Sequence, residues 1–255
     1  MVTDYTACKL TKEDDKLPAI SGLAGKFAAA TGRQYAAGLW EDDLLNGLLW
    51  VVADRSVAKR YTKYIAPSWS WASIEGPVCY PLRFAIKPND GKYSATSARS
   101  YIWLAGTDPH GRVTLGNVTI AALIRQVQYQ YCYETDETAR EFDLFPQGKL
   151  RIKHKGWGNL LLKTYYKTES VPEGTVIGAA YLDEEEPPTG PVYCLLIKPR
   201  LVLVLQSDGF TEYRRIGIGW ISRSGGEYGF SRFDFFGGKN QSFGVYEAMV
   251  EVTVG

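Results

Sequence analysis

The sequence predicts a mainly β protein, an antiparallel β-barrel or sandwich of about ten strands with two short N-terminal α-helices. Two observations lead to this class. Helical apolar spacing is confined to the first quarter of the 255 residues, and from about Pro67 onward short apolar runs are separated by turn residues. Because all-β folds of this length often form one unit, we expect a single domain over residues 1–255, with a helical brace at 1–60 and the barrel or sandwich at 67–255.

The two helices are predicted from apolar spacing and from residues that begin or end helices. In DDKLPAISGLAGKFAAATG, residues 14–32, apolar side chains recur every three or four positions, Pro18 suits a first turn and Gly32 suits a C-terminal end. In EDDLLNGLLWVV, residues 41–52, acidic residues come first, where the helix dipole favours them, and leucines follow on one side. We expect the second helix to serve packing.

The β region contains about eleven candidate strands, a number that suits one closed or double-layered sheet. Turn residues such as Asp90-Gly91 and Asp208-Gly209 separate them. The acidic segment DEEEPPTGP, residues 183–191, is expected to form an exposed loop. The candidate strands are residues 78–87, 101–106, 117–124, 126–133, 149–155, 159–166, 175–182, 192–198, 200–206, 211–221 and 243–252.

Composition and charge exclude several classes of protein. With 29 basic and 28 acidic residues the net charge is +1, so we expect neither nucleic-acid binding nor attraction to anionic lipid. No signal peptide and no run of about 18 apolar residues is present, which predicts a cytoplasmic protein. Cys8, Cys79, Cys132 and Cys194 are far apart and lack metal-ligand spacing, so we expect free thiols and no metal. Nucleophile-elbow, phosphate-loop and dinucleotide motifs are missing, so no cofactor is expected.

Aromatic side chains are the unusual feature of the composition, with 17 Tyr and 7 Trp. If IAPSWSWASIEGPVCY, residues 65–80, is extended, its two Trp–Ser–Trp indoles share one face, which either anchors a core or stacks on a flat ligand. In QVQYQYCY, residues 126–133, three phenols share a face, and they either line a wet cavity or face solvent. A cavity of this composition suits a small molecule. The candidate ligand-binding residues are Trp69, Trp71, Tyr80, Trp103, Tyr129, Tyr131, Tyr133 and Tyr213.

Two histidines are available for imidazole chemistry, and His154 is the candidate catalytic residue. In KLRIKHK, residues 149–155, strand alternation puts four cations on one face and turns His154 toward the apolar side. There it would act as a general acid or base with a pKa lowered by burial. The alternative is a histidine hydrogen-bonded to backbone near the strand end. His110 lies in a turn and is expected to be solvated.

Three ordered blocks, DKLPAISGLA at 15–24, YAAGLWEDDLLNGLLW at 35–50 and APSWSWASIEGPVCY at 66–80, resemble the C-terminal half of fungal heterokaryon-incompatibility proteins. DPHGRV and FTEYRRIGIG resemble the weaker β-rich segments that follow in that family. The resemblance implies a fungal origin. Family members carry a signalling domain before these blocks, and this chain begins only a short way ahead of the first block. The resemblance therefore implies ancestry without carrying over any catalytic residue.

Two functions from different classes remain open. The first is a small-molecule-binding barrel that acts as a cofactor-independent cyclase or isomerase of the pericyclase type in fungal secondary metabolism, by orienting a hydrophobic or aromatic substrate. The second is a non-enzymatic interaction or regulatory module derived from a heterokaryon-incompatibility protein. The sequence leaves the substrate and the formation of a homo-oligomer open.

Overall fold

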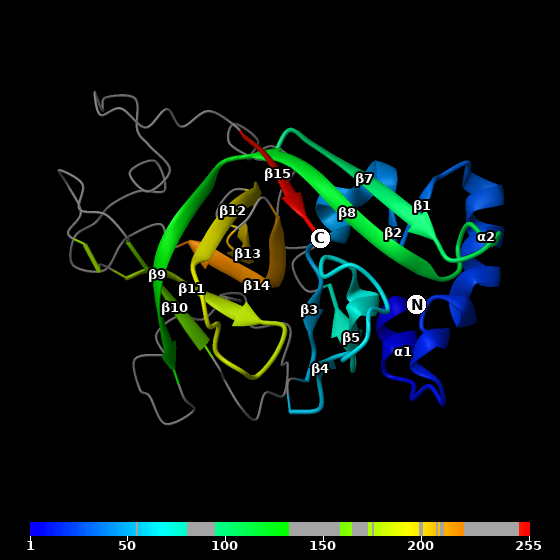
Figure 1. Ribbon diagram of the computed structural model, residues 1–255, viewed down its shortest axis with the longest axis horizontal. Helices are drawn as coiled ribbons and strands as arrows, with labels where there is room; N and C mark the ends of the chain where they lie inside the picture. Colours follow the sequence, from blue (N-terminus) through cyan, green and yellow to red (C-terminus); the bar gives the residue numbers. More distant parts are fainter. Residues whose placement is uncertain are drawn as a thin grey trace.

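The computed structural model describes residues 1–54, 56–80, 95–132, 159–164, 173–174, 176–198, 201–207, 209, 212–221 and 250–255 (Figure 1). The fold is mainly β, as the sequence predicts. Its helices are α1 (Val2–Thr6), α2 (Pro18–Thr31) and α3 (Leu44–Gly47), with 3₁₀ turns η1 (Glu13–Asp15), η2 (Glu41–Asp43) and η3 (Trp71–Ser73). Short strands pair as β1 (Tyr35–Ala36) with β2 (Leu39–Trp40), β3 (Val51–Val52) with β6 (Val78–Cys79), and β4 (Lys59–Arg60) with β5 (Ile74–Glu75).

The first predicted helix is confirmed and the second is only partly helical. Helix α2 begins at Pro18 and ends before Gly32, which adopts the left-handed conformation that glycine tolerates best. In the second segment η2 and the single turn of α3 are followed by strand β3, and Leu44, Leu48 and Leu49 are buried in the cluster against the barrel. Their burial in this tertiary cluster, and not a continuous helix, accounts for the apolar pattern of the segment. Helix α1 has no apolar spacing that predicts it.

Strands β7 to β15 form one nine-stranded sheet and lie at nine of the predicted runs. The predicted strand at 149–155 lies outside the described residues, and of the run at 78–87 the structure describes β6 and Tyr80. The strands are β7 (Ser97–Leu104), β8 (Val113–Ala122), β9 (Ile124–Cys132), β10 (Asn159–Thr164), β11 (Val176–Leu182), β12 (Val192–Lys198), β13 (Leu201–Ser207), β14 (Tyr213–Ile221) and β15 (Val250–Val254).

Six of these strands close into a barrel in the order β11-β10-β9-β12-β13-β14, with β11 pairing back to β14. All pairs within the barrel are antiparallel. Closure depends on glycine, because a Cβ at Gly178 would lie 2.1 Å from the Trp220 carbonyl oxygen and one at Gly217 would lie 2.2 Å from the Tyr181 carbonyl oxygen. Glycine thus lets the two backbones approach where the barrel closes.

Strands β15, β8 and β7 extend the sheet beyond the barrel (Figure 1). Only Leu123 separates β8 from β9, so one bent ribbon runs from the extension into the barrel wall. β15 joins β14 through a single parallel contact and pairs antiparallel with β8. β7 is the outermost of the described strands of the sheet, and its hairpin with β8 reaches toward α2. There a Cβ at Gly25 would lie 3.6 Å from Nδ1 of His110 in the hairpin turn.

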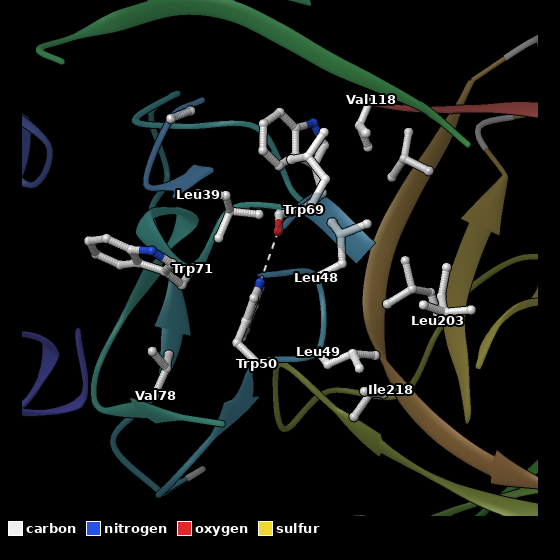
Figure 2. Close-up of a cluster of buried hydrophobic side chains, with 14 of the residues drawn as sticks. Leu39, Leu48, Leu49, Trp50, Trp69, Trp71, Val78, Val118, Leu203 and Ile218 are labelled. Carbon is white, nitrogen blue, oxygen red and sulfur yellow. Dashed lines mark hydrogen bonds between the residues drawn. The ribbon is translucent and has the colours of Figure 1, made fainter. Parts of the chain in front are cut away.

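Buried side chains form two clusters, one inside the barrel and one between the barrel and the N-terminal segments. The first draws aliphatic residues from all six barrel strands, including Leu160, Leu162, Val192 and Val204, each with no exposed surface. In the second, Leu203 on β13 and Ile218 on β14 lie beside residues of the N-terminal segments, as Figure 2 shows. The members from those segments include Leu39, Leu48, Leu49, Trp50, Trp69, Trp71 and Val78.

Candidate functional site

Trp69 and Trp71 are core residues, with 0% and 1% of their surface exposed. The segment is not extended at this point, because residues 71–73 form a 3₁₀ turn, so strand alternation does not place the two indoles. The Ser70 hydroxyl caps this turn by accepting from the Ala72 N–H at 3.0 Å. The Trp71 indole donates to the Gly38 carbonyl at 2.8 Å, and the Trp50 indole donates to the Trp69 carbonyl at 2.9 Å (Figure 2). Through these hydrogen bonds the segment that contains Trp69 and Trp71 is joined to the segments that contain Gly38 and Trp50.

Tyr129 and Tyr131 lie at one end of the barrel, half-buried against its interior cluster. The Tyr129 hydroxyl donates to the Pro188 carbonyl at 2.7 Å, and the Tyr131 hydroxyl donates to the Glu185 carbonyl. Both carbonyls belong to residues 183–191, which connect β11 to β12 and which we call the strap. The phenols are thus satisfied by backbone acceptors, an arrangement that differs from both the wet cavity and the solvent-facing strand.

Trp103 lies on the outer face of the β7–β8 hairpin, and 49% of its surface is exposed. It stands opposite Leu115, which is 52% exposed, and two residues from Tyr101, which is 47% exposed. Residues directly opposite each other in an antiparallel pair project from the same face. We call this surface the Trp103 face. It consists of Ser97, Arg99, Tyr101 and Trp103 on β7 and of Leu115, Asn117, Thr119 and Ala121 on β8.

The remaining candidate residues lie elsewhere. Tyr213 on β14 is half-buried and meets the Tyr193 ring edge-on, with centroids 5.2 Å apart. Tyr80 is half-buried against the cluster between the barrel and the N-terminal segments. His154 and Tyr133 lie outside the described residues. Within the described part of the chain, the aromatic set is therefore divided among two separate core clusters and an exposed face, and ligand binding by these residues stays a prediction.

Arg215 forms a buried ion pair that the sequence patterns did not single out. Its guanidinium has no exposed surface and donates twice to the Asp183 carboxylate, at 3.0 and 3.1 Å. It also donates to the Leu48 carbonyl at 2.5 Å and to the Trp50 carbonyl at 2.7 Å, and it stacks 3.5 Å from the centre of the Trp50 ring. Burial lowers the pKa of Arg215, and the charge of Asp183 opposes that shift.

A second arginine extends this network toward the surface. Arg60 on β4 donates to Glu184 at 3.0 Å and to the Ser73 hydroxyl at 2.8 Å, and it lies 3.5 Å from Asp183. Arg214 also reaches Glu184. The network joins β14, the start of the strap and the N-terminal segments. Its geometry indicates an architectural role.

Lys16 is a further buried charged residue that sequence reasoning missed, with only 2% of its surface exposed. Its ammonium lies 6.0 Å from the ring centres of both Tyr5 and Trp71, at the outer limit of a cation–π contact. Burial lowers the pKa of Lys16 to about 8, and the negative charge of Glu75 opposes the shift. The acidic residues beside Lys16 in DDKL suggest a solvated charge run, so no local signal could have revealed its burial.

Comparison of the chain with protein-family models, with curated proteins and with solved structures gave no match. The resemblance to heterokaryon-incompatibility proteins therefore stays a prediction. Among the described residues, no group of three or more His, Cys, Asp or Glu side chains could hold a metal ion. In the same part of the chain, no helix is both long and apolar enough to cross a membrane.

Proposed function

We propose that this chain is a non-enzymatic recognition module that binds a protein partner through the Trp103 face. The observation that carries the proposal is the exposure of Trp103, Leu115 and Tyr101 side by side on paired strands. An apolar surface of large side chains gathered on one rigid face is typical of a binding site, because monomeric proteins rarely leave such surfaces open without a use.

Four of the other candidate ligand-binding residues have a structural use already. Trp69 and Trp71 are enclosed by the core, and both indoles are out of reach of an external ligand in the folded chain. The phenols of Tyr129 and Tyr131 are hydrogen-bonded to the strap. Trp103 is the most exposed of the described tryptophans, with 49% of its surface accessible. Trp, Tyr and Arg are the residues that dominate binding energy at protein interfaces.

The face, rather than the edge of β7, suits a partner. Among the strands that the structure describes, β7 is the outermost of the sheet, so its outer backbone groups could pair with another strand. At the middle of the strand the Ser100 N–H donates to Glu41 at 2.9 Å, and the Ser100 hydroxyl donates to the other oxygen of the same carboxylate. Glu41 thus blocks strand addition at this point and leaves the side-chain face open.

A peptide selection tests the proposal even while the natural partner is unidentified. Random peptides about a dozen residues long would be selected on the full chain and their affinities measured for matched leucine variants. Leu115→Ala removes an exposed leucine from the Trp103 face, and Leu23→Ala removes one of similar exposure, 49%, from α2. We expect Leu115→Ala to weaken binding about tenfold or more and Leu23→Ala to leave it unchanged. Equal effects of the two variants, or failure to select any binder, would refute the proposal.

A second candidate function, the cofactor-independent cyclase or isomerase, is favoured by one observation. Tyr129 and Tyr131 occupy the barrel end that the strap covers, and the chain that leaves β9 there and returns as β10 carries His154 in its sequence. Moving the strap would free two phenols beside an apolar interior, a composition that suits a small organic ligand. Incubating the purified protein and its Tyr129→Phe and His154→Gln variants with metabolites of its own gene cluster tests this function. Turnover that both variants reduce would support it, and no turnover by the unaltered chain would exclude it.

A further inference from the structure

The Trp103 face carries a single charge among its hairpin residues, the guanidinium of Arg99. Arg99 is exposed and stands opposite Thr119, with Tyr101 next along the strand on the same face. Among the described residues, no acidic side chain pairs with Arg99. The described arginines at positions 33, 60, 112, 214 and 215 all have a carboxylate partner, so Arg99 differs from them.

The strand geometry fixes how this charge is placed relative to the apolar groups. Alternate residues on one face of a strand are about 7 Å apart, so Arg99 and Trp103 are separated by about 13 Å along β7, with Tyr101 between them. A guanidinium binds a carboxylate through two parallel hydrogen bonds, and an aromatic group beside it offers apolar contact. The face therefore presents a cationic end and an apolar end.

We propose that the partner of the Trp103 face is a peptide segment that presents a carboxylate to Arg99 and apolar side chains to Tyr101, Trp103 and Leu115. This inference rests on the proposed recognition function and adds the chemistry of the partner. Arg99 has no acidic partner among the described residues, so a carboxylate on the partner complements its charge, and the neighbouring exposed rings complement apolar groups within about 13 Å of it.

Other classes of occupant fit the face less well. A nucleic acid is held by many cations that neutralise phosphates, and this hairpin face supplies one. A second copy of the chain, docked about a two-fold axis, would bring the same hairpin face against itself. That face contains no acidic residue, so neither Arg99 would gain a carboxylate from it. A different protein with an acidic and apolar segment satisfies both features.

Three parallel peptide selections test the chemistry of the partner, using the same random library on the full chain and on its Arg99→Glu and Lys26→Glu variants. Lys26 is an exposed cation on α2, so its reversal makes the same change in net charge away from the Trp103 face. We expect peptides selected on the unaltered chain to be enriched in Asp and Glu beside apolar residues. They should bind the Arg99→Glu variant about tenfold more weakly and the Lys26→Glu variant equally well. Selection on Arg99→Glu should shift the enrichment to Lys and Arg.

The outcomes separate this inference from the proposed function. If the peptides lose affinity for Leu115→Ala but are neither enriched in acidic residues nor affected by Arg99→Glu, the recognition function stands and the partner chemistry is wrong. If the peptides ignore Leu115→Ala, or if none is selected, the recognition function fails and the inference fails with it. Equal weakening by Arg99→Glu and Lys26→Glu would indicate a general charge effect and would also overturn the inference.

Discussion

Replacing Arg215 with methionine is expected to destabilise the fold far more than the same replacement at its neighbour Arg214. Arg215→Met leaves the buried Asp183 carboxylate without its two-hydrogen-bond partner, and it leaves the carbonyls of Leu48 and Trp50 without their donor. Breaking one side of a buried ion pair costs about 3–5 kcal/mol, and orphaned carbonyls can add to that. Arg214 is half exposed and contacts the partly exposed Glu184, so its replacement is expected to cost about 1 kcal/mol or less.

Urea unfolding of both variants measures this difference directly. The free energies of unfolding should separate by at least about 2 kcal/mol, with the slope against urea concentration unchanged if unfolding remains two-state. The double variant Arg215→Met with Asp183→Leu should recover part of the loss, because it removes the unpaired charge as well. Equal destabilisation by Arg215→Met and Arg214→Met would refute the reasoning, since it would mean that burial of the pair has no energetic consequence.

Three further predictions concern Lys16, the tryptophans and the cysteines. The pKa of Lys16 is depressed to about 8 in the folded chain, so the penalty for burying its charge is fully present below that pH and is lost as the pH rises toward its unfolded value near 10.5. The measured quantity is the unfolding free energy of the unaltered chain minus that of Lys16→Met, obtained from urea titrations. This difference should rise by about 2 kcal/mol between about pH 7 and pH 9.5. A difference that does not change with pH would contradict the prediction. Trp71→Ala should lower the unfolding free energy by about 3–5 kcal/mol and Trp103→Ala by less than about 1 kcal/mol, measured by the same titrations. Similar losses for the two variants would contradict the burial of Trp71 and the exposure of Trp103. Iodoacetamide should label the exposed Cys8 rapidly and the buried Cys194 only after unfolding, as mapped by mass spectrometry, and early labelling of Cys194 would contradict the closed barrel interior.

Elements with a local pattern could be predicted from the sequence. The apolar spacing after Pro18 and the glycine at 32 define α2 almost to the residue, because both ends of the helix depend on neighbouring positions. The strands of the barrel alternate or are continuously apolar, and turn residues separate them, so their existence follows from periodicity. The choice between barrel and sandwich depends on pairing of β11 with β14, a long-range contact that periodicity does not encode.

The candidate site could be predicted only in part, because which of its side chains are exposed and which are buried depends on contacts between distant segments. Alternation puts Trp103 and Tyr101 on one face of β7. This face is exposed because the N-terminal segments pack against the opposite face, and the sequence pattern does not show that placement. The phenol of Tyr129 finds its acceptor 59 residues away, in the strap. Lys16 is enclosed by Tyr5 and by Trp71, and the second of these belongs to another segment. Burial of this kind is a property of tertiary packing.

The position at which a peptide selected on the whole chain binds tests the recognition function most directly. Hydrogen–deuterium exchange of the unaltered protein, with and without the tightest selected peptide, maps that position over all of its segments. We expect protection of backbone amides to concentrate in residues 97–104 and 113–122, the two strands that carry the Trp103 face. Protection at the strap, residues 183–191, with β7 and β8 unchanged, would contradict recognition through this face and would favour a ligand site at the barrel end.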